Sequence, residues 1–188
     1  MMSIKPEWCE KIASGKITIV VRKIRPKSKP PFKVYIYCAN GGRLLYKSGY
    51  NNQIHIWQAK EHKTTRETLE TNGNHVFNGK VIGEFVCDRI EEWDSEYWND
   101  DSVYQAISRI DYDYEGDYEL VNIASNEDDN PSNNYLCKES CLSFEEIQRY
   151  VGNNRFYAWH ISDLVIYDKP KKLNLSIVAL NSVERKSK

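Results

Sequence analysis

The sequence has no run of about 18 apolar residues, and apolar side chains make up only 40% of its 188 residues. A helix that spans a membrane needs a run of about that length, so we expect a chain that does not cross one. The first residues also lack the apolar core of a secretory signal. These two absences predict a cytoplasmic protein.

Cysteine and histidine are few and poorly placed for a metal. Five cysteines and four histidines are spread along the chain, and only Cys137 and Cys141 lie close together. No second pair of cysteines or histidines accompanies them at the spacing of a zinc site. An odd number of cysteines without an export signal is typical of reduced thiols. The sequence therefore predicts no metal and no cofactor.

The charge is balanced over the whole chain, with 26 Lys and Arg against 27 Asp and Glu, but not along it. Residues 1–83 carry 15 basic against 5 acidic side chains, and residues 84–130 carry 2 against 16. Such a division indicates one positive surface that meets a polyanion. The alternative is that the two parts neutralise each other in the fold.

Strands dominate the expected secondary structure. Residues 16–22 are β-branched almost throughout, and period-two alternation places Ile17, Ile19 and Val21 on one face. A short helix that begins near Pro6 ends just before this strand, at Ser14-Gly15. A second helix is expected over residues 143–152, where Ser and Glu residues form a capping box. Further strands are expected over residues 33–39, 43–47, 53–58, 79–90 and 156–167.

These strands lie too close together in the sequence for helical crossovers between parallel strands. The pattern favours an α+β protein, a small mixed, mostly antiparallel β-barrel with flanking helices. We expect one domain over residues 1–173, with an acidic insertion at about 91–135. Residues 174–188 are expected to form a basic C-terminal tail.

A short helix ending in Ser-Gly, followed by a β-branched strand that runs into Arg22-Lys23, resembles the opening motif of ASCH domains, members of the PUA-like superfamily. The resemblance continues, in the expected order, in residues 31–38, 79–88 and 157–170. The acidic insertion and the tail lie outside it. The resemblance implies a PUA-like barrel that serves as an RNA-binding module, a coactivator-type domain or a small hydrolase.

Two departures from the family pattern fall where chemistry would occur. The pattern Gly-x-Lys-Thr-Ile-(Glu or Thr)-x-Arg places Ile17 at the family lysine and Val20 at the family Glu or Thr. An aliphatic side chain can neither attack a carbonyl nor move a proton. Lys16 is adjacent, but strand alternation points it to the opposite face. It replaces the family lysine only if the strand shifts its register or begins one residue later.

We therefore expect a non-enzymatic RNA- or nucleotide-binding module. Lysine and arginine hold phosphates, and aromatic rings stack unpaired bases. The residues expected to contact nucleic acid are Lys16, Thr18, Arg22, Lys23, Arg25 and Lys27. The residues expected to form the pocket wall are Trp8, Trp159 and His160. Tyr35 and Tyr37 are further candidates for stacking, and the simplest alternative places all these aromatic rings in the core.

Two other functions remain open. One is an amidohydrolase acting on an acylated nucleoside such as N4-acetylcytidine, with Lys16, Thr18 and Glu146 as its reactive groups. Glu146 also has a competing role in the capping box, and His160 has a competing place in the core. The other is a protein-interaction module, such as a bacterial or phage accessory protein, that docks a basic partner through the acidic insertion. A surface insertion that is merely soluble is the alternative to this last function.

Overall fold

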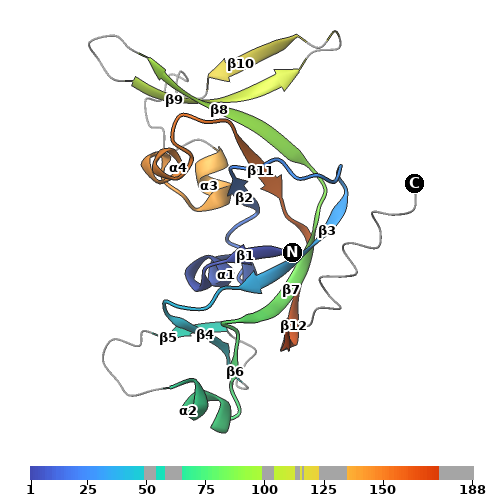
Figure 1. The fold of residues 1–188 in the computed structure, drawn as a ribbon, viewed down its shortest axis with the longest axis vertical. Helices are drawn as coiled ribbons and strands as arrows, with labels where there is room; N and C mark the ends of the chain where they lie inside the picture. Colours follow the sequence, from blue (N-terminus) through green and yellow to red (C-terminus); the bar gives the residue numbers. More distant parts are fainter. Residues whose placement is uncertain are drawn as a thin grey trace. The chain divides into compact units, whose positions relative to one another are not determined.

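The structure is a computed structural model, and its fold is drawn in Figure 1. The chain forms two compact units. Unit 1 comprises Met1–Gly15, Lys33–Val86 and Asp163–Lys188, and unit 2 comprises Lys16–Phe32 and Cys87–Ser162. The residues that the structure describes are 1–48, 54–57, 65–98, 104–112, 115, 117–122 and 135–173. The predicted basic tail lies outside these ranges, and so does part of the predicted acidic insertion.

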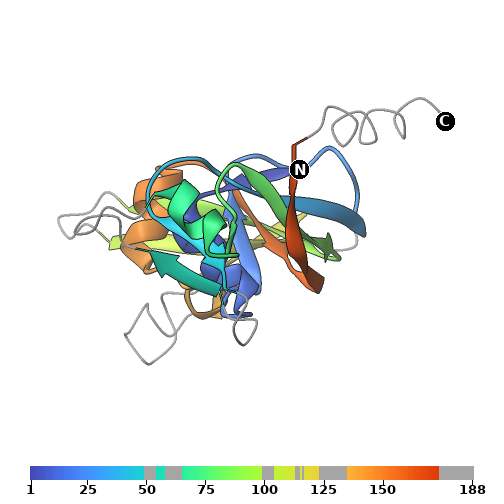
Figure 2. The same ribbon diagram turned by 90° about the horizontal axis from the view of Figure 1, so that it is seen from below.

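Unit 1 contains a four-stranded sheet in the order β1-β3-β7-β12. Its strands are β1 (Met2–Ile4), β3 (Phe32–Cys38), β7 (Lys80–Cys87) and β12 (Ser162–Lys172). The strand β1 pairs in parallel with β3, and β12, red in Figure 2, forms the other edge. A three-stranded sheet consists of β5 (Ile54–Trp57), β4 (Leu44–Lys47) and β6 (His75–Val76). The helices of this unit are α1 (Pro6–Ala13) and α2 (Arg66–Thr71).

The sequence explains where α1 and β3 form. Pro6 occupies the first turn of α1, where its missing N–H costs no hydrogen bond. Gly15 follows the helix at φ +71°, a left-handed conformation that glycine adopts without a steric penalty. In β3, alternation buries Val34, Ile36 and Cys38 on one face. The helix and the strand thus both form where the sequence predicts them.

Gly83 allows two strands of unit 1 to approach closely. A Cβ atom at this position would lie 2.3 Å from the carbonyl oxygen of Val165 on β12. Such a contact is far shorter than a normal van der Waals distance, and it involves a backbone atom that cannot rotate away. The backbone of the neighbouring strand β12 therefore requires a glycine at this position of β7.

Unit 2 contains a five-stranded sheet in the order β10-β9-β8-β11-β2. Two helices pack against one face of this sheet, and their apolar residues join Ile19, Val21, Trp93 and Phe156 in one buried core (Figure 1). The strands are β2 (Ile19–Arg22), β8 (Ile90–Trp98), β9 (Tyr104–Tyr112), β10 (Tyr118–Asn122) and β11 (Phe156–His160), and the helices are α3 (Tyr135–Ser140) and α4 (Phe144–Val151). The first turn of α4 is closed by the predicted capping box.

The described residues of the predicted acidic insertion, which we call the acidic segment, lie mostly in strands. Its residues form β8, β9 and β10, which are consecutive antiparallel strands of the unit 2 sheet. These strands are difficult to predict from the sequence, because acidic residues occur between the buried side chains Trp93, Ile107 and Ile110. The segment contributes three of the five strands of this sheet. Tertiary burial of a few large side chains has here outweighed weak local strand propensity.

Two long strands expected from the sequence are each divided in the structure. The strand predicted over residues 79–90 ends at Cys87, and β8 begins at Ile90. The strand predicted over residues 156–167 is divided at Ile161 into β11 and β12, which belong to different sheets. Neither break contains a proline or a glycine, so the sequence does not mark it with a residue that ends strands.

The fold class is α+β, with mixed sheets and few helices, as predicted. In the part of the chain that the structure describes, the strand pairings form three open sheets, and the predicted closed barrel is not shown. None of the helices in these described ranges has the length and apolar composition that a membrane span requires. The expectation of one domain over residues 1–173 stays a prediction.

Candidate functional site

The chain from Lys16 to Phe32, which we call the basic segment, belongs to unit 2 and contains no acidic residue. Every cation of this segment except Arg22 is exposed, and Arg22 is half-buried on β2. The six cations are Lys16, Arg22, Lys23, Arg25, Lys27 and Lys29. The basic segment is therefore a run of accessible positive charge that no neighbouring carboxylate in the sequence neutralises.

In and next to β2, the side chains of the basic segment alternate between a buried face and a more exposed face. Ile17, Ile19 and Val21 are buried, whereas Val20 and Arg22 are half-buried on the other face. This division confirms the predicted alternation. Ile17 is only 4% exposed. A buried aliphatic residue at this position suits packing and offers no reactive group.

Thr18 is held by a carboxylate that sequence reasoning missed. Its hydroxyl donates a hydrogen bond to the carboxylate of Glu139 on α3. Its backbone N–H donates to the carbonyl of the same glutamate over 2.9 Å, and its own carbonyl accepts from Ile161 over 2.8 Å. No motif in the sequence pointed to this partner, because Glu139 lies 121 residues after Thr18.

Lys16 lies beside this pair but is not drawn into it. Its side chain is exposed, and among the described residues its ammonium group makes no ion pair. Its backbone carbonyl accepts a weak hydrogen bond from the thiol of Cys141 over 3.2 Å. The structure thus places the Lys16 backbone against the turn after α3 and leaves the side chain to solvent.

Beyond β2, the basic segment contains a cation that covers an aromatic ring. The Nζ atom of Lys23 lies 4.9 Å from the ring centroid of Tyr150 on α4, within the range of a cation–π interaction. Tyr150 remains 42% exposed. The next residue, Ile24, is 78% exposed, followed by exposed Arg25. Charged, aromatic and apolar groups are therefore all accessible within a few residues.

His160, predicted as part of a pocket wall, lies in an ionic cluster at the end of β11. Its Nε2 atom is 3.2 Å from Oε1 of Glu91, and its Nδ1 atom is 3.2 Å from Nη2 of Arg89. The same guanidinium nitrogen lies 3.2 Å from Glu91, whose other oxygen accepts a hydrogen bond from Tyr135. Both ring nitrogens of His160 therefore lie close to charged groups, although Nε2 makes no hydrogen bond of good geometry among the described residues.

The electrostatics of this cluster favour an ionised glutamate. Burial alone raises the pKa of Glu91, but the contact with His160, the hydrogen bond from Tyr135 and the nearby charge of Arg89 outweigh it and lower the pKa to about 2. Burial and the Glu91 carboxylate together raise the pKa of Tyr135. A carboxylate held in this way is ionised and a weak base at neutral pH.

The two tryptophans expected to wall a pocket belong to different units. Trp159 lies in unit 2, where its ring meets the ring of Phe32 edge-on at 5.6 Å. Trp8 lies on α1 in unit 1, where the Nζ atom of Lys11 is 4.3 Å from its ring centroid. Each ring has a partner from its own unit. A shared wall formed by both rings stays a prediction.

Glu146, the acid of the alternative hydrolase set, serves as the capping residue of α4. Its carboxylate accepts a hydrogen bond from the backbone N–H of Ser143 over 2.9 Å, and its own N–H donates to the Ser143 hydroxyl over 3.2 Å. This reciprocal pair is the structural role that the sequence indicated. A carboxylate so engaged is poorly placed for acid–base chemistry at Lys16 or Thr18.

The acidic segment is partly neutralised within unit 2. Arg155 lies 3.2 Å from Glu92 and 3.3 Å from Asp94, both on β8. Glu115 and Asp117 are exposed. Arg155 lies outside residues 1–83, so these contacts do not test the alternative in which the basic and acidic parts of the chain neutralise each other. The ion pair of Lys33 with Glu84, at 2.7 Å, joins those two parts at one point. A protein partner at this segment stays a prediction.

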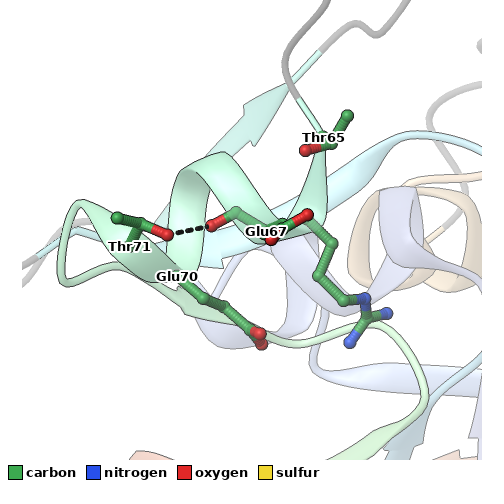
Figure 3. A pocket seen from close by; sticks show the side chains of 5 residues that line it. Thr65, Glu67, Glu70 and Thr71 are labelled. Carbon is green, nitrogen blue, oxygen red and sulfur yellow. Dashed lines mark hydrogen bonds between the residues drawn. The ribbon is translucent and has the colours of Figure 1, made fainter.

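Unit 1 has a shallow pocket on its surface, and none of the residues that line it is a predicted site residue. Residues of α2 and the preceding Thr65 line it, and Thr71 donates a hydrogen bond to the Glu67 carbonyl over 2.8 Å (Figure 3). Arg66 donates to the carbonyl of Asn78, and Glu70 binds Lys80. Because its polar groups are bound within the unit, we assign this pocket no role.

No protein-family model matches the chain, and no curated protein matches it. Among solved structures, the whole chain is similar to the crystal structure of ASCH from Zymomonas mobilis, with 16% identity, 79% of that chain covered and a TM-score of 0.46. It is also similar to a mutant of that protein, with 15% identity, 81% of that chain covered and a TM-score of 0.42. Both are named as ASCH, the family that the sequence motifs resemble.

Proposed function

We propose that this protein is an ASCH-type, PUA-like module that binds RNA or a nucleotide-like ligand without turning it over. The observation that carries this function is the basic segment, in which six cations occur without any acidic residue and five of them are exposed. Phosphate groups are the ligand that such a run of lysine and arginine holds best.

The neighbourhood of Lys23 supports nucleic acid over a simple inorganic anion. Its ammonium group lies over the ring of Tyr150, which is itself partly exposed. An unpaired base can stack on such a ring while the lysine turns to the adjoining phosphate. Arg22 contributes a second cation from β2. The hydroxyl of Thr18, which donates to Glu139, keeps its oxygen lone pairs as acceptors for a ligand N–H or O–H.

Three features support binding without catalysis. Ile17 and Val20 place aliphatic side chains where the related family has reactive groups. Glu146 is engaged in the capping box of α4. The ammonium group of Lys16 is exposed and, among the described residues, is not paired with a carboxylate that could take up its proton.

The test is a fluorescence-anisotropy titration of a labelled single-stranded RNA at two salt concentrations. We expect the logarithm of the affinity to fall with the logarithm of salt by about 0.7 for each phosphate contact. The double variant Arg22→Ala, Lys23→Ala should bind more weakly and show a smaller slope. The matched control is Lys5→Ala, which removes an exposed cation from unit 1. An affinity that does not depend on salt would contradict the proposal.

The hydrogen bond between Thr18 and Glu139 favours a second candidate function. A hydroxyl held by a carboxylate is the geometry of an activated nucleophile, and Lys16 is two residues away. A hydrolase acting on an acylated nucleoside would then use Glu139 in place of Glu146. Incubation with N4-acetylcytidine and related acylated nucleosides, followed by chromatography, tests this function. Release of the free nucleoside would replace the binding function with the hydrolytic one.

A further inference from the structure

We propose that the sheet of unit 1 carries a second surface, which stacks unpaired bases of single-stranded RNA. We call it the tyrosine face. The residues that form it are Lys33, Tyr35, Tyr37, Glu84, Tyr167 and Lys171. This inference takes its class of ligand from the proposed function, but it assigns a different site in a different unit of the protein.

Alternation along β3 creates the face. Val34, Ile36 and Cys38 point into the core of unit 1 and are at most 3% exposed. The residues between them therefore point to the opposite side of the sheet. Of these, Lys33 is exposed and both Tyr35 and Tyr37 are half-buried. One strand thus presents a cation and two aromatic rings in a row.

Glu84 of β7 links this row to β12. One of its oxygens lies 2.7 Å from Nζ of Lys33, and the other accepts a hydrogen bond of 2.6 Å from the hydroxyl of Tyr167. The hydrogen bond and charge of Lys33, together with the bond from Tyr167, lower the pKa of Glu84 despite its partial burial. Three adjacent strands thereby present one connected group of side chains, and the ring of Tyr167 is fixed at its hydroxyl end.

The ring of Tyr167 is covered by the side chain of Lys171. The Nζ atom of Lys171 lies 4.1 Å from its ring centroid. Lys169, Lys171 and Lys172 are all exposed at the end of β12. A base that stacks on this ring displaces the ammonium group of Lys171, which is then free to bind the phosphate that joins this base to the next.

Unpaired bases are the occupant that fits these observations. A sheet whose aromatic side chains stack successive bases, with lysines beside them for the backbone, is a common way of binding single strands. Because Glu84 is neutralised by Lys33, it does not repel the phosphates. In a duplex the bases stack on each other and their faces are not available, so the tyrosine face should discriminate against double strands.

The test compares ring removal with ring retention. Tyr35→Ala and Tyr167→Ala should each weaken the binding of a labelled single-stranded RNA about tenfold, which corresponds to the loss of one stacked base. Tyr35→Phe keeps the ring and should change the affinity less than about twofold, because stacking needs only the ring face. Tyr35→Ala should leave the salt dependence unchanged, since no charge is removed. Tyr167→Ala should reduce the salt slope by about one phosphate contact, because the stacked base that brings a phosphate to Lys171 is lost.

Thermal unfolding of each variant shows whether it remains folded. Tyr37→Ala provides a further ring removal without a hydrogen bond to Glu84, in case Tyr167→Ala does not fold. A Tyr35→Phe variant as weak as Tyr35→Ala would overturn the inference, as would alanine variants that bind like the unchanged protein.

The same titrations in an Arg22→Ala, Lys23→Ala background separate this inference from the proposed function. If only the basic-segment variant loses affinity, the tyrosine face is wrong and the proposed function stands. If only the tyrosine variants lose affinity, the tyrosine face binds the RNA and the basic segment does not. An unchanged protein that binds no RNA would contradict both. Competition by duplex RNA as strong as by single strands would overturn the stacking role.

Discussion

The hydroxyl of Thr18 donates a hydrogen bond to the carboxylate of Glu139, which lies 121 residues further along the chain. The bond joins the start of β2 to α3 and is reinforced by a backbone bond between the same two residues. It places a polar, exposed pair directly beside Lys16. This pair is where the binding and the hydrolytic functions of the basic segment would differ.

Removal of the Thr18 hydroxyl should affect stability slightly and binding more. Thr18→Val keeps the shape but loses the donor, and we expect the free energy of unfolding to fall by about 1 kcal/mol. Thr18→Ser, which keeps the hydroxyl, is the control. Denaturant unfolding measures the stability, and the RNA titration measures the affinity. A Thr18→Val protein that binds RNA like the unchanged chain would exclude Thr18 from the site.

Glu91 should make the protein sensitive to acid. Its pKa is about 2 in the fold and 4.5 as the ordinary value, so the unfolded chain takes up a proton first. The stabilisation is therefore complete above about pH 4.5 and is lost as the pH falls toward 2. A shift of this size corresponds to about 3 kcal/mol. Urea unfolding between pH 7 and pH 3 measures it.

Glu91→Gln provides the control for this pH dependence. The glutamine cannot ionise, so the variant should be less stable at neutral pH and should lose less stability on acidification. A variant that loses as much stability on acidification as the unchanged chain would show that other carboxylates cause the acid sensitivity.

Glu146 should behave as a capping residue and not as a catalytic acid. Glu146→Gln preserves the capping box, because glutamine also accepts the backbone hydrogen bond, and it should leave the stability unchanged. Glu146→Ala should lower the free energy of unfolding by about 1 kcal/mol. Both variants should bind RNA normally. A loss of activity in Glu146→Gln, on any acylated nucleoside that the protein hydrolyses, would assign this carboxylate to chemistry.

Gly83→Ala should be strongly destabilising. The added Cβ atom would lie 2.3 Å from the Val165 carbonyl oxygen, so β7 and β12 must separate. We expect a loss of about 2 kcal/mol or more, typical of overpacking. Thermal unfolding provides the measurement, and an unchanged midpoint would contradict the close approach of these strands. RNA binding by the tyrosine face should fall together with stability, since both strands contribute residues to it.

Ile24 offers a way to test the basic segment without disturbing the core. It is 78% exposed and lies between Lys23 and Arg25. Ile24→Glu should leave stability within about 0.5 kcal/mol, as is usual for surface positions. It should weaken RNA binding several-fold, because the new carboxylate repels phosphate. Ile24→Gln, uncharged and of similar size, is the control.

Local chemistry in the sequence predicted several elements correctly. The proline near the start of α1 and the Ser-Gly after it determine that helix, and Ser143 with Glu146 determine the start of α4. Alternation also predicted which side chains of β2 are buried. These features depend on residues within a few positions of each other, so they can be predicted from the local sequence.

The acidic segment and the partner of Thr18 could not be predicted in this way. The strands β8 to β10 form because Trp93 and Ile107 are buried against the unit 2 core, although the residues between them are acidic and polar. Glu139 meets Thr18 because α3 packs beside β2. Neither relationship leaves a signal in the local sequence.

By itself the sequence determined the cationic character of the segment before β3, the aliphatic residues at positions 17 and 20, and the two sides of each short strand. Tertiary structure alone decided that His160 is bound by Arg89 and Glu91, and that Tyr167 and Lys33 meet at Glu84. The physical reason is the distance along the chain over which each effect acts. Side-chain type and strand periodicity act over a few residues, whereas the grouping of charges and rings depends on which distant strands become neighbours.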